Sequence, residues 1–498
     1  MTFTRKSRVI AVTSVLFVAL ALLITAGCAV GPNFKRPAAP NVPGYTPSLP
    51  ATTSSSPNVA GGEAQTFTQG RDIPGDWWTL FHSKPLNDLI ERSLKNNPDL
   101  KSAQAALQVA RENTLAQRGA YYPQVSGSFS ATRAKTSDEI SPVPSFTSFQ
   151  YSLFTPEVSV SYTPDVFGLN RRTVESLKAQ QEQARYVVAA TNITLSSNVA
   201  AAAIQEASLR AQIDATNQLI EINSKQLDLL RKQFEKGYVG RLDVAAQEAQ
   251  LAQVAATLPP LLKQLAQQRD LLAALSGGYP NEDLVEKFEL SSLQLPQELP
   301  LSLPSKLVEQ RPDVLQAEEN LYSASALIGV ARANRLPSFN LTGDIGSMAL
   351  AFGNIFSAGN GFRDVGASVT QPIFQGGTLL HKERAARAAY VQADEQYRST
   401  VLAAFQSVAD TLHALEQDAD GLKAAIAARD AAKVTLDLTT RQMQVGYVSY
   451  LALLNAEQSY QQAVINLVQA QANRYADTAA LFQALGGGWW NRADVPKS

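Results

Sequence analysis

The sequence predicts an α+β membrane protein in which an internal duplication supplies four short β-strands and two long helical hairpins. Three observations predict this fold: an apolar leader that ends at the only cysteine, landmarks that recur roughly every 210 residues, and segments whose apolar residues follow a period of two or a heptad. The 498 residues carry 43 basic and 44 acidic side chains, so the chain has no basic field for nucleic acid. With one cysteine and three histidines, we expect no cofactor, no bound metal, no catalytic residues and no enzymatic activity.

The N-terminus has the pattern of an export signal. A positively charged start precedes the apolar run of residues 9–24, which is too short to span a hydrocarbon core of ~30 Å comfortably. The run ends in Thr25-Ala26-Gly27-Cys28, which is similar to a bacterial lipobox, although Thr25 stands where leucine is usual. We therefore predict a lipoprotein signal peptide over residues 1–27 and palmitate attachment at Cys28; the alternative is a secreted protein with a free thiol. By analogy with other lipoproteins, Ala29 indicates sorting to the outer membrane.

Residues 28–75 are rich in proline, serine, threonine and glycine. Such a composition buries too little apolar surface to fold alone, so we predict a lipid-anchored extended linker. No later stretch reaches the ~18 apolar residues that a transmembrane helix needs. The rest of the chain is therefore expected to lie in the periplasm or to cross the membrane as strands.

Landmarks along the chain recur in the same order. Gly237-Tyr238-Val239 returns as Gly446-Tyr447-Val448, and Glu248 returns as Glu457 at the same interval. Five such matches in one order indicate a duplicated unit. The predicted divisions are a first repeat over 76–280, a linker over 281–301, a second repeat over 302–488 and a C-terminal tail over 489–498.

Each repeat contains two segments in which apolar or small residues alternate with polar ones. These segments are residues 125–131, 154–162, 339–345 and 365–369. Period-two alternation over about ten residues is typical of a transmembrane strand with one face to lipid and one to water. It is equally typical of a half-buried strand in a soluble sheet, and the alternation leaves both interpretations open.

Four strands cannot close a barrel, and an open sheet edge is not tolerated in lipid, where every backbone group needs a partner. If these strands lie in a membrane, several chains must share one barrel. Two chains would supply eight strands, and side chains fill the interior of an eight-stranded barrel. Three chains would supply twelve strands, which could enclose an open lumen. Conduction therefore favours a trimeric 12-stranded barrel.

A long helix follows the second strand of each repeat. Residues 171–234 contain neither proline nor glycine and carry an apolar heptad seam, so we predict a coiled helix of roughly 95 Å. Four polar residues interrupt the seam, which we interpret as a helix that faces water on more than one side; they are Asn192, Glu206, Thr216 and Asn223. The second repeat has an equally long run over 379–444, interrupted by Gly421.

Glycines are expected to end both long helices, because a residue just after a helix commonly takes a left-handed conformation. Shorter helices then follow over 242–275 and 450–485, which makes one helical hairpin in each repeat. In the first of these helices Pro259-Pro260 removes backbone donors, so we predict a break there.

Several stretches taken together resemble the TolC-like outer-membrane factor family, in its lipobox-bearing NodT-type form that serves resistance-nodulation-division efflux pumps. The matching stretches are Cys28-Ala29-Val30-Gly31-Pro32-Asn33-Phe34, Trp77-Trp78-Thr79-Leu80-Phe81, Asn97-Pro98-Asp99-Leu100, Arg311-Pro312-Asp313-Val314 and residues 446–457. The resemblance implies a homotrimer whose outer-membrane β-barrel continues as a long coiled α-helical barrel in the periplasm. It further implies passive conduction of small molecules from the periplasm to the outside. The implied partners are an inner-membrane pump, a periplasmic adaptor (membrane fusion protein) and outer-membrane lipid.

The resemblance also implies a gate at the second hairpin. Family members carry acidic rings just after its tip, but the corresponding positions here are Ala452 and Asn455, so an aspartate ring is in doubt. Leu451 matches an apolar constriction, and we predict that Leu451, Ala452 and Asn455 line the closed mouth. The alternative is ordinary packing and solvated residues of a coiled coil.

Asp243 matches a position that the family uses for polar links between tips. The usual basic partner falls on Val448, which cannot serve, and Arg241 or Arg441 would have to replace it. An exposed pair of this kind is worth at most ~1 kcal/mol, so a solvated carboxylate is the competing interpretation.

The tips are candidate contacts for the adaptor, because small residues permit close backbone approach. The candidate residues are Gly237, Tyr238, Gly240, Gly446, Tyr447 and Ser449. Two other functions remain open. One is a duct for type I protein secretion; the other is a periplasmic structural coiled coil held by lipid alone, which would become soluble once Cys28 is removed.

Overall fold

The computed structural model describes residues 29–48, 50–135, 137, 150–282, 284–493 and 495. Cys28 and the leader before it lie outside the described residues. The chain forms two compact units, which are described separately. Unit 1 comprises the described parts of Met1–Arg36, Gln108–Gln183 and Ala317–Tyr397, and unit 2 comprises those of Pro37–Leu107, Ala184–Gln316 and Arg398–Ser498.

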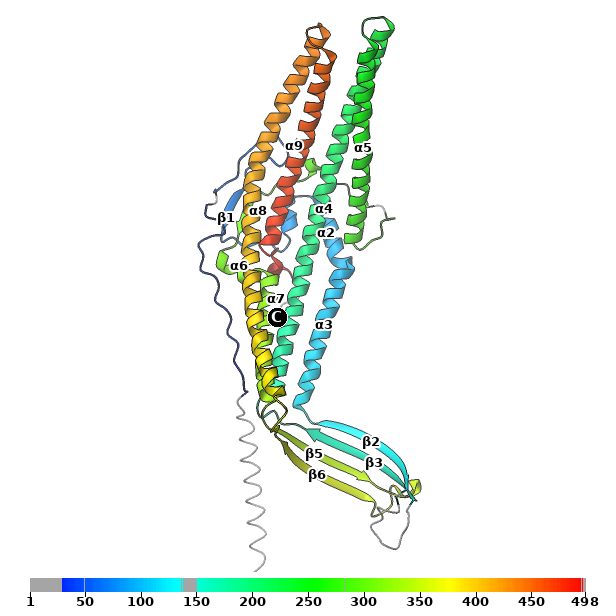
Figure 1. Ribbon diagram of the computed structural model, residues 1–498, viewed down its shortest axis with the longest axis vertical. Coiled ribbons are helices and arrows are strands. Elements are labelled where there is room, and N and C mark those ends of the chain that lie inside the picture. The colour runs from blue at the N-terminus through cyan, green and yellow to red at the C-terminus, as the bar shows by residue number, and fades with distance from the viewer. Residues whose placement is uncertain are drawn as a thin grey trace, which may run out of the picture. The chain divides into compact units, whose positions relative to one another are not determined.

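The order of elements repeats along the chain (Figure 1). After the short helix η1 (Trp77–Phe81) and α2 (Lys84–Asn96), the first half runs helix, strand, strand, long helix and shorter helix. These elements are α3 (Pro98–Arg118), β2 (Gln124–Lys135), β3 (Gln150–Tyr162), α4 (Leu169–Glu235) and α5 (Arg241–Leu275). After α6 (Pro304–Gln310), the second half repeats the order with α7 (Pro312–Ala333), β5 (Ser338–Ser347), β6 (Gly361–Thr370), α8 (Thr378–Gln444) and α9 (Tyr450–Ala484).

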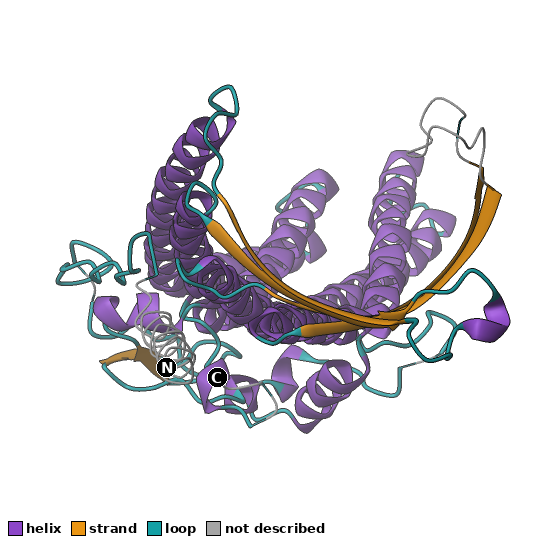
Figure 2. Cartoon of the chain, turned by 90° about the horizontal axis from the view of Figure 1, so that it is seen from below, coloured by secondary structure: helices purple, strands orange, loops and turns teal. Residues whose placement is uncertain are grey.

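The four longer strands form one antiparallel sheet in unit 1, in the order β2-β3-β5-β6. Figure 2 shows that this sheet is curved. The strands have 12, 13, 10 and 10 residues, close to the ~9–11 that a tilted transmembrane strand needs. All four predicted strands are therefore present, and each extends beyond its predicted bounds.

The helices confirm the heptad and glycine patterns. Both α4 and α8 have 67 residues, which at ~1.5 Å per residue gives a length of about 100 Å. Gly421 does not interrupt α8, because an interior glycine costs a helix only about 1 kcal/mol relative to alanine. One described helix, α4, contains an 18-residue window apolar enough to cross a membrane. The mean hydropathy of this window is high although polar residues interrupt its apolar residues. Within the protein, 67% of the window is buried.

The predicted break in α5 is wrong, since Pro259-Pro260 lies inside a continuous helix. An interior proline removes a backbone hydrogen bond and costs about 3 kcal/mol. Contacts to α4 on both sides of the pair offset this cost. Before the prolines, Gln247 Nε2 donates to the Asn223 carbonyl at 3.0 Å; after them, Gln268 Nε2 donates to the Ala202 carbonyl at 3.0 Å.

The polar residues of the α4 seam do not face water, so the interpretation of α4 as a helix exposed to water on more than one side is also wrong. Asn192, Glu206, Thr216 and Asn223 are all buried rather than exposed to water. Three of them have partners inside unit 2: Arg210 and Arg269 pair with Glu206 Oε1 at 2.6 and 3.0 Å, and the Thr216 hydroxyl and Asn223 amide each donate to an α4 carbonyl at 2.8 Å. Buried polar groups of this kind are tolerated where hydrogen bonds compensate them.

The core of unit 2 gathers aromatic side chains of η1 and α9. Trp77 stacks on Phe482 with ring centroids 5.2 Å apart, and Phe81 lies against Tyr475. Within the predicted linker, residues 66–69 form the short strand β1 (Thr66–Gln69). This strand pairs in parallel with β4 (Glu298–Leu301), a pairing that the sequence did not predict.

Candidate functional site: a two-faced open sheet and two hairpin tips

One face of the four-stranded sheet is apolar. Side chains of directly paired residues lie on the same face of a sheet. The register aligns two mostly apolar rows on one face, Val125–Val160–Gly343–Val365 and Gly127–Val158–Ile345–Arg363. These side chains are not covered in the chain, and Val365 is 88% exposed. A contiguous exposed apolar patch of this kind marks a surface that contacts lipid or another protein.

The opposite face is polar and acidic. Its rows include Ser126–Ser159–Asp344–Asp364 and Ser128–Glu157–Gly346–Phe362. Asp344 stands directly opposite Asp364, an arrangement that is destabilising in an ordinary sheet because the charges repel. The described strand residues on this face include no lysine or arginine. Such a face requires water or mobile cations next to it.

The two edges of the sheet are open. In the described chain, β2 and β6 each pair with a strand on one side only, so their outer backbone groups face outward unpaired. Exposed edges of this length are templates for pairing with another strand.

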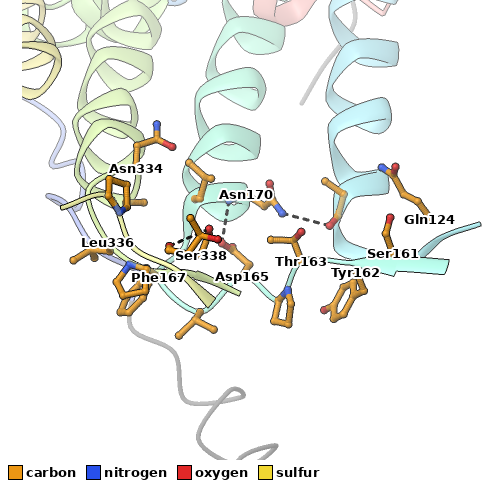
Figure 3. A pocket seen from close by; sticks show the side chains of 18 of the residues that line it. Gln124, Ser161, Tyr162, Thr163, Asp165, Phe167, Asn170, Asn334, Leu336 and Ser338 are labelled. Atoms are coloured by element: carbon orange, nitrogen blue, oxygen red, sulfur yellow. Dashed lines mark hydrogen bonds between the residues drawn. The ribbon is translucent and has the colours of Figure 1, made fainter. Parts of the chain in front are cut away.

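A cavity of about 410 Å³ lies where the strands meet the helices (Figure 3). Asp165 lines it and accepts hydrogen bonds from the backbone N–H groups of Asn170 at 3.0 Å and Arg171 at 2.9 Å. The Asn170 side chain donates to the Ala120 carbonyl at 3.3 Å. Asp165 thus satisfies first-turn amides of α4 and complements the positive end of the helix dipole. The polar groups of this cavity join strands to helices.

The residues that directly follow Cys28 lie at the same junction in unit 1. The Val30 N–H donates to the Phe167 carbonyl at 3.1 Å, and Arg172 Nη2 donates to Asn33 Oδ1 at 2.8 Å. Gly31 takes φ +103°, and a Cβ there would lie 2.5 Å from the Cα of Gly329. The chain just after the predicted lipid site is therefore held beside the ends of the strands.

The two hairpin tips of unit 2 share one backbone design. In the first, the N–H of Gly237 donates to Phe234 and that of Tyr238 to Gln233, each at 2.9 Å. This is the Schellman motif, which requires the positive φ of +79° at Gly237. The second tip repeats it at Gly446, where φ is +81°.

The tip residues after these glycines are exposed or cap the next helix. Tyr238 is 76% exposed and Tyr447 is 85% exposed. Gly240 is the N-cap of α5, whereas Ser449 caps α9 by accepting a hydrogen bond from the Ala452 N–H at 3.4 Å. A groove beside the second tip is lined by Arg441, Gln442, Val445, Tyr447 and Val448.

The gate candidates lie on one stripe of α9. Leu451 is 65% exposed, Asn455 is exposed and Ala452 is half-buried. The opposite stripe packs inside the chain and contains Leu453, Leu454, Ala456 and Glu457. The structure therefore leaves Leu451 and Asn455 free to face a bore or another copy of the chain.

Asp243 has a role within its own hairpin. Its Oδ2 accepts a hydrogen bond from the Gly240 N–H at 3.1 Å, which supplies the N3 half of a capping box at the start of α5; glycine at the N-cap has no side chain to supply the other half. Arg241, a candidate partner for Asp243, pairs instead with Glu248 at 3.4 Å.

Polar contacts join the two hairpins, and the sequence did not predict them. The Tyr450 hydroxyl of α9 donates to Gln247 Oε1 of α5, and Gln458 Nε2 donates to Gln250 Oε1 at 3.0 Å. The signal that could have found them is the polar interruption of the α4 seam at Asn223, because Gln247 also donates to Asn223 Oδ1 at 3.1 Å.

An open, two-faced membrane-type sheet combined with long helical hairpins defines a channel-forming outer-membrane protein. A sequence model of the outer membrane efflux protein family matches residues 89–278 and 303–487. The chain belongs to this family, whose members are channels rather than enzymes. It is an outer-membrane duct of an efflux pump that extends into the periplasm.

Three relatives illustrate the similarity. The chain is 30% identical over 487 residues to the probable efflux pump outer membrane protein TtgC of Pseudomonas putida, covering 96% of each chain. It is 28% identical to the cation efflux system protein CusC of an Escherichia coli O6:H1 strain, covering 94% of this chain and 97% of that one. The solved outer-membrane channel OprN is 25% identical, with a TM-score of 0.81 and coverage of 93% and 100%.

Proposed function

We propose that three copies of this chain close one 12-stranded barrel in the outer membrane. The observation that carries the proposal is the sheet of four strands with one apolar face, one polar face and two open edges. The edge strand β6 of one copy pairs with β2 of the next, so that every backbone group in lipid gains a partner. Three copies leave an open interior, whereas two would leave one filled by side chains.

The apolar rows of this barrel face lipid and the acidic rows line a water-filled bore. Lipid on Cys28 tethers each copy, and the segment after it lies beside the strand ends, where a lipid anchor would be placed. Along the chain, the proposed divisions are the signal peptide over 1–27, the anchored linker over 28–75, the repeats over 76–280 and 302–488, the linker over 281–301 and the tail over 489–498.

The long helices of three copies form a helical barrel in the periplasm, and the complete duct conducts small molecules passively to the outside. An inner-membrane pump of the resistance-nodulation-division type loads it through a periplasmic adaptor that contacts the two tips. The efflux-pump names of TtgC and CusC support these partners. In the described residues no three His, Cys, Asp or Glu side chains gather to hold a metal, and the proposal uses no cofactor.

Leu451 and Asn455 of three copies line the closed periplasmic mouth in this assembly, because they form the exposed stripe of α9. We expect Leu451→Gly to widen the constriction and to raise single-channel conductance in planar bilayers. The matched control is Leu242→Gly in the first hairpin, an exposed leucine outside the proposed gate. Unchanged conductance of the Leu451 variant would remove the gate assignment.

The assembly itself is tested with Cys28→Ala. The variant should still need detergent, should run as a trimer in light scattering and should show discrete conducting steps, because the barrel rather than the lipid holds it in the membrane. A monodisperse, detergent-free monomer would instead support the periplasmic coiled coil held by lipid alone.

A further inference from the structure

A buried carboxylic acid lies in the second hairpin without a partner. Glu457 of α9 is 4% exposed, and both of its carboxyl oxygens are buried. Among the described residues neither oxygen has a hydrogen-bond partner, and the side chain forms no ion pair. A carboxylate in such surroundings loses its hydration without compensation, so the protonated form is favoured.

The corresponding residue of the first hairpin has the opposite environment. Glu248 occupies the same place after its tip and pairs with Arg231 at 3.0 Å and with Arg241 at 3.4 Å. At the matching positions of the second repeat stand Thr440 and Tyr450, which carry no positive charge. The two repeats therefore share the acid, and only the first has the two cations.

The polar and charged groups around Glu457 come from the helices packed against α9 and from α9 itself. On α4 the Gln226 amide acts on the Glu457 carboxyl, and it also accepts a hydrogen bond from Gln247 of α5 at 3.3 Å. On α8 the charged neighbour is Lys433, whose Nζ lies 5.9 Å from the ring centroid of Tyr460, about one turn beyond Glu457 on α9; in the described chain it forms no ion pair with Glu457. On α9 itself, burial and the charges of Glu457 and Asp243 raise the pKa of Tyr450. Burial also raises the pKa of the Glu457 carboxyl, and Gln226 offsets only part of that rise.

We propose that Glu457 is a proton-sensitive positioning residue: when it is protonated α9 packs against α4 and α5, and when it is ionised this contact weakens and the periplasmic mouth opens. The inference rests on the proposed function, since it takes the start of α9 to line that mouth. The polar contacts of Tyr450 and Gln458 with α5 join the same two hairpins and separate with them.

The direction of the pH effect follows from linkage. The packed state holds the Glu457 proton more tightly than the separated state, so packing is favoured at low pH and is lost as pH rises through the raised pKa. The ratio of open to closed dwell times should therefore rise about tenfold for each unit by which packing raises that pKa. Single-channel recordings between about pH 5 and about pH 8 measure this ratio.

The test compares Glu457→Gln with its matched control, Glu248→Gln. The Glu457 variant keeps the shape but cannot ionise, so it should stay mostly closed with a flat pH profile. Glu457→Met, which is similar in volume and apolar, should behave in the same way if the amide is poorly tolerated. The Glu248 variant should keep the wild-type profile, because its pairs are exposed and worth little. A wild-type profile in both Glu457 variants would overturn the inference.

Hydrogen exchange separates this inference from the conduction proposal. After correction for the intrinsic pH dependence of exchange, the amides of residues 450–458 should lose protection in the wild type as pH rises and keep it in Glu457→Gln. If the wild type forms no conducting channel but shows this exchange pattern, the proposed duct fails while the proton-dependent packing of α9 through Glu457 stands. If conduction is normal and exchange is the same in both proteins, the role of Glu457 fails alone.

Discussion

Acidic side chains brought close together are the most informative single residues of the helical hairpins. Asp418 of α8 lies beside Asp477 of α9, and its Oδ2 is buried without a hydrogen-bond partner in the described chain. Burial and the Asp477 carboxyl raise the pKa of Asp418 to about 7, against the opposing charge of Arg474. Two carboxyl groups this close share one proton, because both cannot ionise at low cost.

The Asp418 pair makes the stability of unit 2 depend on pH. Because folding raises this pKa from 3.8 to about 7, the folded chain holds the proton more tightly. The contribution of the pair is present below the unfolded value and is lost as pH rises through about 7. We expect Asp418→Asn to raise the melting temperature at about pH 8 and to change it little at about pH 4. Calorimetry at both values measures this, and a lower melting temperature at about pH 8 would contradict it.

At the scale of elements, the features set by local sequence patterns were predicted correctly, whereas those set by contacts between distant residues were not. Residues 171–234 and 379–444 were predicted as helices and appear as α4 and α8 with ends at most two residues away, since heptads and glycine C-caps are local signals. The break at Pro259-Pro260 was wrong because contacts with α4 hold α5 on both sides. Strand β1 was missed because its partner β4 lies more than 200 residues away, beyond any local pattern.

For the candidate site, too, the features set by local patterns were predicted and those set by contacts were not. The exposed tips at Tyr238 and Tyr447 and the alternation of the strands were visible in the sequence, because turns and period-two patterns are local. The capping role of Asp243 and the missing partner of Glu457 depend on which side chains meet, so they required the structure.

The two faces of the sheet make an element-scale prediction. Val365 belongs to the apolar face and Ser368, three residues later on β6, belongs to the polar face. An arginine on a lipid-facing strand costs about 2–4 kcal/mol near the bilayer midplane, whereas one facing the bore stays hydrated. We expect Val365→Arg to reduce sharply the amount of folded trimer in outer-membrane fractions and Ser368→Arg to leave it near wild type. Equal loss in both variants would contradict the assignment of faces.

At the scale of the whole molecule, the acids of the polar face act together. Glu157, Asp344 and Asp364 repeat in every copy of the proposed ring, and the described strand residues of this face carry no opposing cation. Field lines focused in a narrow bore concentrate counter-ions, so the duct should prefer cations.

Ion selectivity measures this collective effect. In a gradient of potassium chloride, wild-type channels should show a reversal potential on the cation-selective side. Asp344→Asn combined with Asp364→Asn should move the reversal potential toward zero, and the shift should shrink at high salt because of screening. The control is Asp418→Asn, which alters an acid of the α8–α9 contact and should leave the reversal potential unchanged. An unaffected potential in the double variant would show that these acids do not line the bore.

The strand order β2-β3-β5-β6 has an evolutionary consequence. In the proposed ring, the seam between two copies joins β6 to β2 just as the seam inside a copy joins β3 to β5, so both seams link one repeat to the other. A half-length ancestor would have needed six identical subunits to build the same wall. Fusion of two such genes would halve that number and free each half to diverge, which fits the different surroundings of Glu248 and Glu457.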